Sequence, residues 1–238
     1  MNTLNDLNIN IYADGAEIEK LEEIKKLDFI KGFTTNPTLM KQAGIKNYKD
    51  FALKFTQIVG NYPVSFEVFS DDIAEMQKQA EEIASWNKNI IIKVPITNTK
   101  GESTKYLIKN LTDQEIPLNI TAIFTINQIN EVIDFINPKT YCILSIFAGR
   151  IADTGVDPVP LFKEIKKIVD IHSNIDLLWA SPRELLNIFH ANQSGADIIT
   201  VHADILNKLK LINKDLNEYS IETVKMFYND AQKAGFNI

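Results

Sequence analysis

The sequence is poor in cysteine, with Cys142 the only one among 238 residues. A single cysteine cannot form an intrachain disulfide, and no cysteine or histidine lies at a spacing that would complete a zinc site. Cys142 stands in an apolar run, so core packing is its expected role. The first residues lack a basic segment followed by an apolar stretch. No apolar run reaches the ~18 residues that a membrane span needs, so a cytoplasmic protein is expected.

Positive charge is not in excess either. Lysine and arginine total 25 against 31 aspartate and glutamate, a formal net charge of −6. Nucleic-acid binding needs a basic surface, so it is not expected, and any anion site must be local. Common nucleotide-binding, zinc-protease and serine-hydrolase motifs are missing. The three histidines, His172, His190 and His202, lack metal-ligand spacing and are expected to be structural or exposed.

Short β-rich segments alternate with stretches of helical periodicity, which is typical of βαβ units. The expected strands cover residues 8–14, 32–36, 64–68, 89–94, 118–122, 141–146, 177–181 and 197–201. Eight parallel strands close a barrel, and the length is near the ~250 residues typical of that fold. The sequence therefore predicts one (β/α)₈ barrel domain over residues 1–238, without linkers or repeats.

Polar residues followed by proline predict helix starts after three of these strands. The pairs are Asn36-Pro37, Asp157-Pro158 and Ser181-Pro182, which suit the N-cap and first helical positions. Residues 203–238 are expected to form a helical extension. Its apolar residues Ile221, Val224, Tyr228 and Ala231 share one helix face. A completed barrel offers this face no obvious place, so a homo-oligomer is expected.

Lys93 stands out because it lies within the apolar segment IIIKVP, residues 90–95. In a strand its side chain points with Ile91 and Pro95, opposite to Ile92 and Val94. The carboxyl end of a barrel strand faces the active site. Burial there favours the neutral amine, which can attack a carbonyl carbon to form a Schiff base. The alternative is a lysine whose side chain extends to solvent from an ordinary strand end.

Other strand ends are polar where a plain barrel core would be aliphatic. They carry Asp14, Thr34, Asn36, Glu67, Asn119, Thr121, Ser145 and Ser181. Singly, each is consistent with a turn or cap, but together they suit a polyhydroxylated ligand that would pair buried polar groups. Arg150 and Arg183 follow the sixth and seventh strands. With Ser181 and the helix expected from Pro182 they suit a phosphate group, although surface salt bridges are the alternative.

Six motifs, taken in order, resemble those of the transaldolase family, which includes a fructose-6-phosphate aldolase branch. They are GFTTNPTL, FEVFSDD, IIIKVP, LNITAIFT, ILSIFAGRI and WASPREL, within residues 10 to about 202. The resemblance implies a Schiff base between Lys93 and a ketose phosphate such as fructose 6-phosphate. Carbon–carbon cleavage then leaves a dihydroxyacetone carbanion on the enzyme. It also implies sugar phosphate substrates, a place in the pentose phosphate pathway, and no metal or organic cofactor.

The resemblance also implies a role for each matched residue. Asp14 would be the acid/base at the substrate hydroxyl, and Glu67 and Thr121 would hold the water that relays protons. Contacts to the sugar and the Schiff base match Asn36, Asn119 and Ser145, and the phosphate site matches Arg150, Ser181 and Arg183. Thr34, at its polar strand end, is also expected to bind the substrate.

Glu67 and Phe147 resemble the transaldolase branch, whereas the aldolase branch has Gln and Tyr at these positions. Phenylalanine has no proton to give the carbanion, so transfer to an aldose phosphate is expected. Two alternatives remain open. One is a fructose-6-phosphate aldolase, or an aldolase for another sugar phosphate, and the other is a non-catalytic phosphosugar-binding barrel.

Overall fold

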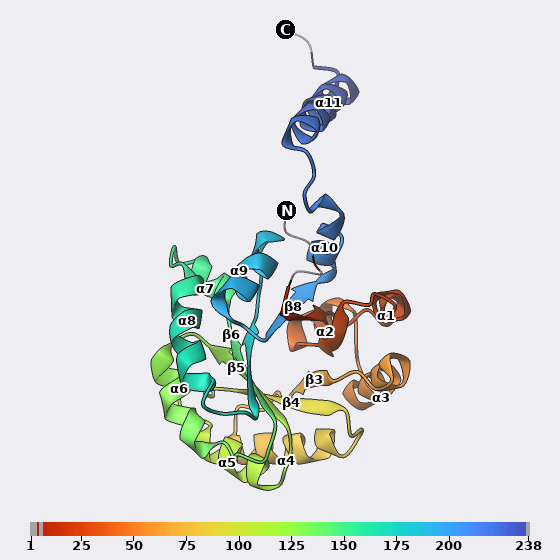
Figure 1. Ribbon diagram of the computed structural model, residues 1–238. Coiled ribbons are helices and arrows are strands. Elements are labelled where there is room, and N and C mark those ends of the chain that lie inside the picture. The colour runs from red at the N-terminus through yellow and green to blue at the C-terminus, as the bar shows by residue number, and fades with distance from the viewer. Residues whose placement is uncertain (1–3, 5–6, 237–238) are drawn as a thin grey trace.

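In the computed structural model, which describes residue 4 and residues 7–236, eight parallel strands form one closed barrel (Figure 1). The strands are β1 (Asn10–Asp14), β2 (Ile30–Thr34), β3 (Val64–Glu67), β4 (Ile90–Pro95), β5 (Leu118–Ile123), β6 (Cys142–Ile146), β7 (Ile175–Trp179) and β8 (Ile198–His202). Their order in space follows the chain, and β8 pairs with β1 to close the barrel. The predicted (β/α)₈ fold is confirmed, with β2 and β7 each lying two residues earlier than expected.

Helices surround the barrel as a ring (Figure 1). They are α1 (Ile18–Ile24), α2 (Pro37–Gln42), α3 (Tyr48–Val59), α4 (Ile73–Ala84), α5 (Lys105–Asp113), α6 (Ile126–Val132), α7 (Ala148–Ala152), α8 (Pro158–Val169), α9 (Leu186–Ser194) and α10 (Ala203–Leu206), followed by α11 (Leu216–Ala234). The order also includes the 3₁₀ turns η2 (Ile133–Phe135) and η3 (Leu209–Leu211). Two of the predicted caps are confirmed, because the side chains of Asn36 and Asp157 accept backbone N–H bonds at the starts of α2 and α8.

The third predicted helix start, at Pro182, is wrong. Ser181 has a φ of 60°, a left-handed conformation that does not lead into a helix at the next residue. The Asn187 side-chain oxygen accepts hydrogen bonds from the backbone N–H groups of Arg183 and Glu184. These amides are therefore used within a turn, and α9 begins at Leu186.

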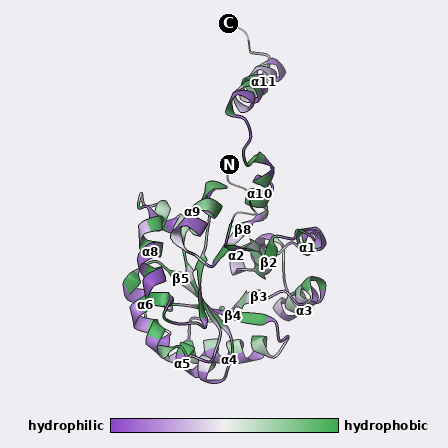
Figure 2. Cartoon of the chain, in the orientation of Figure 1, coloured by the Kyte–Doolittle hydropathy of each residue, from purple (hydrophilic) through white to green (hydrophobic). Residues whose placement is uncertain are grey.

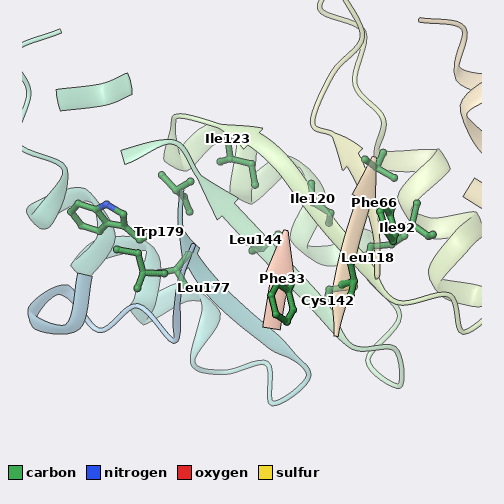
Figure 3. Close-up of a cluster of buried hydrophobic side chains, with 14 of the residues drawn as sticks. Phe33, Phe66, Ile92, Leu118, Ile120, Ile123, Cys142, Leu144, Leu177 and Trp179 are labelled. Carbon is green, nitrogen blue, oxygen red and sulfur yellow. The ribbon is translucent and has the colours of Figure 1, made fainter. Parts of the chain in front are cut away.

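Two hydrophobic layers lie on opposite faces of the strands. The outer layer packs the barrel against the helices and includes Phe33, Phe66, Ile92 and Trp179 (Figure 3). The inner layer fills the barrel with Tyr12, Ile91, Ile143, Leu178, Ala180 and Ile198. Residues alternate between the two faces along a strand, so Lys93 points inward with Ile91 while Ile92 and Val94 point outward. The predicted direction of Lys93 is confirmed.

Two small details support this packing. Cys142 is buried in the outer layer, as expected, and burial raises the pKa of its thiol to about 12.

Gly32 on β2 lies against the Tyr12 ring inside the barrel. A Cβ atom there would come within 2.6 Å of ring carbons. Glycine at this position thus makes room for the aromatic side chain that closes the amino-terminal half of the barrel interior.

Helix α11 forms the predicted C-terminal extension and stands away from the barrel (Figure 1). It has no buried residue, and Ile221, Val224, Phe227 and Tyr228 are each more than half exposed. Figure 2 shows hydrophobic and hydrophilic residues mixed along it. No helix in the described ranges has the length and apolar character to cross a bilayer.

Candidate active site

A cavity of about 550 Å³ opens at the carboxyl ends of the barrel strands. Its lining includes Asp14, Thr34, Asn36, Glu67, Lys93, Asn119, Thr121, Ser145, Phe147, Arg150 and Ser181. All the residues predicted to form the site are therefore brought together except Arg183, which does not line the cavity. The polar strand ends converge because every strand of a parallel barrel finishes at the same end.

Lys93 lies on the wall of this cavity with only 8% of its surface exposed. Its Nζ donates a hydrogen bond to the Thr35 carbonyl oxygen at 2.9 Å and lies 3.3 Å from a carboxylate oxygen of Glu67. A buried charge is costly unless it is paired and hydrogen-bonded, and both conditions hold here. The alternative of a lysine extending to solvent is excluded by this burial.

Glu67 ends β3 beside Lys93 on β4, since the two residues are register partners in the parallel pair. The Tyr48 hydroxyl on α3 donates to the Glu67 carbonyl oxygen at 2.8 Å. Burial raises the pKa of the Tyr48 phenol, which keeps it protonated and able to donate. Tyr48 therefore fixes the backbone that carries the carboxylate.

Asp14 ends β1 next to Thr34 on β2. The Thr34 hydroxyl donates to Asp14 Oδ1 at 2.7 Å. Burial raises the pKa of Asp14, and the nearby Glu67 charge adds to this. Lys93, the Thr34 hydrogen bond and His202 act in the opposite direction. A carboxyl group with a raised pKa is suited to giving and taking a proton near neutral pH.

A second set of polar side chains crosses β3, β5 and β6. The Ser145 hydroxyl donates to Asn119 Oδ1 at 2.6 Å, and Asn119 Nδ2 donates to the Ser65 hydroxyl at 3.0 Å. All three side chains are buried. This chain fixes the Asn119 amide, so that its oxygen and nitrogen have defined directions beside Lys93, its register partner on β4.

Thr121 lies in a distorted part of β5. The pairing of β5 with β6 shifts between Ile120 and Ile123, and Ala122 adopts a φ of 60°. Such a bulge redirects side chains at the end of a strand. The Thr121 hydroxyl is buried and has no hydrogen-bond partner among the described residues, although it lines the cavity. A buried hydroxyl without a partner is uncommon, so a water molecule or a ligand in the cavity would be its natural partner.

The two arginines differ in position. Arg150, on α7, lines the cavity, and its guanidinium carbon lies 5.8 Å from the centre of the Phe147 ring. Arg183 instead forms an ion pair with Asp153, and both side chains are about half exposed. The Arg183 side chain also passes close to Gly149. A Cβ atom at Gly149 would lie 3.2 Å from Arg183 Nε and 1.6 Å from the Ser181 carbonyl oxygen. Glycine is thus required for the close approach of α7 to the Ser181 turn.

Several lining residues were not predicted. The most notable are Thr200 on β8, Gln42 on α2 and Phe124 after β5. Thr200 lies two residues before the end of the apolar strand β8, between Ile199 and Val201. Because those two residues face outward, the alternation of the strand could have predicted that Thr200 points into the barrel. Gln42 is the last residue of α2, and Phe124 follows the end of β5. The alternation of strand residues does not predict which way side chains point in helices and loops. Within the described residues, no group of three His, Cys, Asp or Glu side chains could hold a metal ion.

Comparison with known families gives a match over residues 11–238 to the family described as "Transaldolase/Fructose-6-phosphate aldolase". Two similar proteins are each named "Probable transaldolase". The one from Dehalococcoides mccartyi is 31% identical over 94% of this chain and all of its own length. The one from a Thermoanaerobacter species is 33% identical over 97% of this chain and all of its own length.

Among solved structures, a similar fold occurs in KGPDC from Streptococcus mutans. The TM-score is 0.56 at 7% sequence identity, and the match covers 82% of this chain and 88% of that protein. Identity this low supports the barrel fold alone.

The raised pKa of Asp14 has a consequence for stability. A carboxyl group whose pKa rises on folding stabilises the fold fully below its unfolded pKa. That contribution is lost as the pH rises through the folded pKa. At neutral pH the partly buried carboxylate of Asp14 therefore costs stability. We expect Asp14→Asn to raise the thermal midpoint at pH 7, by roughly 2–4 °C for each kcal/mol of relief, and to raise it less at pH 4.

Asp71 provides the opposite control. Its pKa is lowered by hydrogen bonds from the backbone and hydroxyl of Thr99, so Asp71→Asn should lower the midpoint at pH 7. Thermal unfolding followed by circular dichroism at both pH values measures the two changes. An Asp14→Asn variant that is less stable than the wild type at pH 7 would contradict this electrostatic account.

Proposed function

The chain belongs to the transaldolase and fructose-6-phosphate aldolase family, and from that premise we propose that it transfers a dihydroxyacetone unit through a Schiff base on Lys93. The donor is a ketose phosphate such as fructose 6-phosphate, and the acceptor is an aldose phosphate. The observation that carries the proposal is the buried Lys93 amine, 3.3 Å from Glu67 in a polar cavity that also contains Asp14. Carbohydrate metabolism of the pentose phosphate type is the matching context.

The first step forms the covalent bond. Lys93 Nζ, after losing a proton, attacks the C2 carbonyl carbon of the ketose, and the carbonyl oxygen leaves as water. Glu67 is the nearest carboxylate to the amine, at 3.3 Å, and is the acceptor for its proton. The buried Thr121 hydroxyl supplies a binding point for the water that carries protons between Glu67 and the departing oxygen.

The second step breaks the bond between C3 and C4. The Asp14 carboxylate takes the proton of the C4 hydroxyl, an aldose phosphate leaves, and the electron pair moves into the protonated Schiff base. The dihydroxyacetone unit then adds to the aldehyde carbon of the acceptor, and Asp14 returns the proton. Water adds to C2 of the new Schiff base, the bond from C2 to Lys93 Nζ breaks, and the ketose phosphate product leaves the free amine behind. The raised pKa of Asp14 suits a group that must hold and release a proton in alternate steps.

The remaining polar groups suit the sugar hydroxyls. Asn119 and Ser145 are fixed by their mutual hydrogen bond beside Lys93. Thr34 lies next to Asp14. The Asn36 side-chain oxygen caps α2, which leaves its amide nitrogen for a ligand. These roles are proposed from the family resemblance together with their place in the cavity.

Arg150 and Ser181 are proposed to bind the substrate phosphate, because both line the cavity and a guanidinium suits a phosphate geometrically. Arg183 joins them only if its side chain leaves Asp153. An exposed ion pair of this kind contributes little stability, so a bound phosphate dianion can compete for the arginine. Asp153 is thus a competitor for the phosphate-binding arginine.

Assembly into a homo-oligomer is part of the proposal. Helix α11 exposes Leu216, Val224, Phe227 and Tyr228, and none of its residues is buried in the single chain. A helix with this much exposed apolar surface is stabilised when that surface packs against another part of a protein. In the proposed oligomer, a second copy of the chain covers this face of α11.

The transferase assignment predicts that the dihydroxyacetone unit is transferred to an acceptor rather than released as free dihydroxyacetone. Wild-type protein given fructose 6-phosphate alone should release little free dihydroxyacetone, and adding erythrose 4-phosphate should start transfer. Phe147→Tyr places a phenol where Phe147 now packs on the interior cluster. The phenol can protonate the carbanion, so dihydroxyacetone release should rise about tenfold or more relative to transfer.

Phe124→Tyr is the matched control, since Phe124 also lines the cavity and its ring lies 5.8 Å from that of Phe147. Chromatography of both products with and without acceptor gives the ratio. Equal dihydroxyacetone release by the wild type with and without acceptor would replace the transferase assignment with the aldolase alternative.

The phosphate site predicts a separation between substrates. Arg150→Ala and Arg183→Ala should each weaken binding of a phosphorylated donor by about 1.5–3 kcal/mol, the contribution of a hydrogen bond to a charged group. Asp153→Asn should lower the KM for the same donor because it releases Arg183. Steady-state kinetics with fructose 6-phosphate and with unphosphorylated fructose measure the difference. Unchanged use of the phosphorylated donor by both alanine variants would rule out this site.

The assembly proposal predicts a mass above 27.0 kDa in solution. Light scattering at micromolar concentration should give a multiple of this mass. Replacing Phe227 and Val224 by Asp should lower the mass, because charges on the apolar face of α11 oppose its burial. Matched changes on the polar face, Lys225→Asp with Asn229→Asp, should leave it unchanged. A wild-type monomer would contradict the proposal.

A further inference from the structure

Thr200 reaches the cavity from β8, on the side of Asp14 opposite to Glu67 and Lys93. Strand β1 pairs with β2 on one side and with β8 on the other, so each neighbour can place a side chain beside Asp14. Thr34 is the register partner of Asp14, whereas Thr200 is the partner of Tyr12, one inward position lower. Thr200 is 7% exposed and lines the cavity.

The three side chains form a continuous hydrogen-bonded chain. Thr34 Oγ1 donates to Asp14 Oδ1 at 2.7 Å, and the hydroxyl oxygens of Thr34 and Thr200 are 2.5 Å apart. A hydroxyl has one proton to give. When Thr34 gives its proton to the Asp14 carboxylate, Thr200 must donate to Thr34. When Asp14 is protonated, it becomes a donor, and both hydroxyls can rotate so that Thr34 donates to Thr200.

Hydroxyl groups differ in this respect from the charged groups around Asp14. Lys93 on β4 only donates, the Glu67 carboxylate on β3 only accepts, and His202 on β8 is engaged with Asp204 at 3.3 Å. Each of these charges favours a single protonation state of Asp14, since Lys93 and His202 lower its pKa and Glu67 raises it. A pair of hydroxyls can stabilise both states with the same heavy-atom positions.

We propose that Thr200 is a positioning residue that acts through Thr34, so that the two hydroxyls hold the Asp14 carboxyl group in place in both of its protonation states. The inference rests on the proposed function, in which Asp14 alternately takes and returns a proton. Thr200 itself need not touch the substrate. Its hydroxyl fixes the direction of the Thr34 hydroxyl, and Thr34 fixes the carboxyl oxygen.

Variants of Thr200 separate this role from simple packing. Thr200→Val keeps the shape and removes the hydroxyl, and Thr200→Ser keeps the hydroxyl. Thr200→Ala also removes the hydroxyl and has a smaller side chain than valine. It replaces Thr200→Val as the test if the valine variant does not fold. Thr56→Val on α3 is the matched control, because Thr56 is also buried and its hydroxyl bonds only to carbonyl oxygens of its own helix.

We expect Thr200→Val to lower kcat for transfer about tenfold, the effect of losing one hydrogen bond in a chain to a charged group, with the donor KM changed less than about twofold. Thr200→Ser should recover most of kcat, and Thr56→Val should leave it unchanged. In a Thr34→Val background, Thr200→Val should cause little further loss, because its effect passes through Thr34. Full additivity of the two losses would overturn the inference.

A measurement that does not depend on turnover separates the inference from the proposed function. Carbon-13 NMR of the Asp14 carboxyl group, assigned with Asp14→Asn, gives its pKa directly. Thr200→Val should raise this pKa relative to the wild type, while Thr200→Ser and Thr56→Val should not. Both states lose support, but the hydrogen-bonded chain is stronger when it ends on the ionised carboxylate, so the ionised state loses more. This shift in a protein that lacks transferase activity would uphold the Thr200 role and reject the proposed function. An unchanged pKa in Thr200→Val would overturn the role.

Discussion

The burial of the Lys93 amine is the constraint on which the rest of the site depends. A buried ammonium group needs both a counter-charge and a hydrogen-bond acceptor. Strand β3 supplies the Glu67 carboxylate and the chain just after β2 supplies the Thr35 carbonyl oxygen, at 3.3 and 2.9 Å. The three contributing segments are therefore tied together at one end of the barrel, and Tyr48 on α3 fixes the Glu67 backbone from outside.

The two ends of the barrel serve different purposes. The amino-terminal half of the interior is closed by Tyr12, Ile143 and Ile198, and this packing depends on the missing side chain at Gly32. The carboxyl-terminal half is polar, and its groups hold one another through hydrogen bonds. A rigid apolar base beneath a polar cavity lets the barrel keep polar and charged side chains in fixed positions at modest cost to stability.

Much of this arrangement is predictable from sequence, because period two decides which strand residues face inward. That rule correctly placed Lys93, Asn119 and Ser145 inside the barrel. It could not predict the turn at Ser181, where the Asn187 side chain takes two backbone amides and delays α9 to Leu186. The pairing of Arg183 with Asp153 joins residues 30 positions apart across two loops, and neither loop has a periodic pattern.

Trapping of the covalent intermediate tests the central claim, that Lys93 is the nucleophile, most directly. Borohydride added to protein with fructose 6-phosphate reduces a Schiff base to a stable amine, and peptide mass spectrometry locates it. We predict added mass on the peptide that contains Lys93, none without the sugar, and none in Lys93→Met. Mass added at another lysine, such as the ion-paired Lys166, or no added mass at all under conditions of active turnover, would contradict the account.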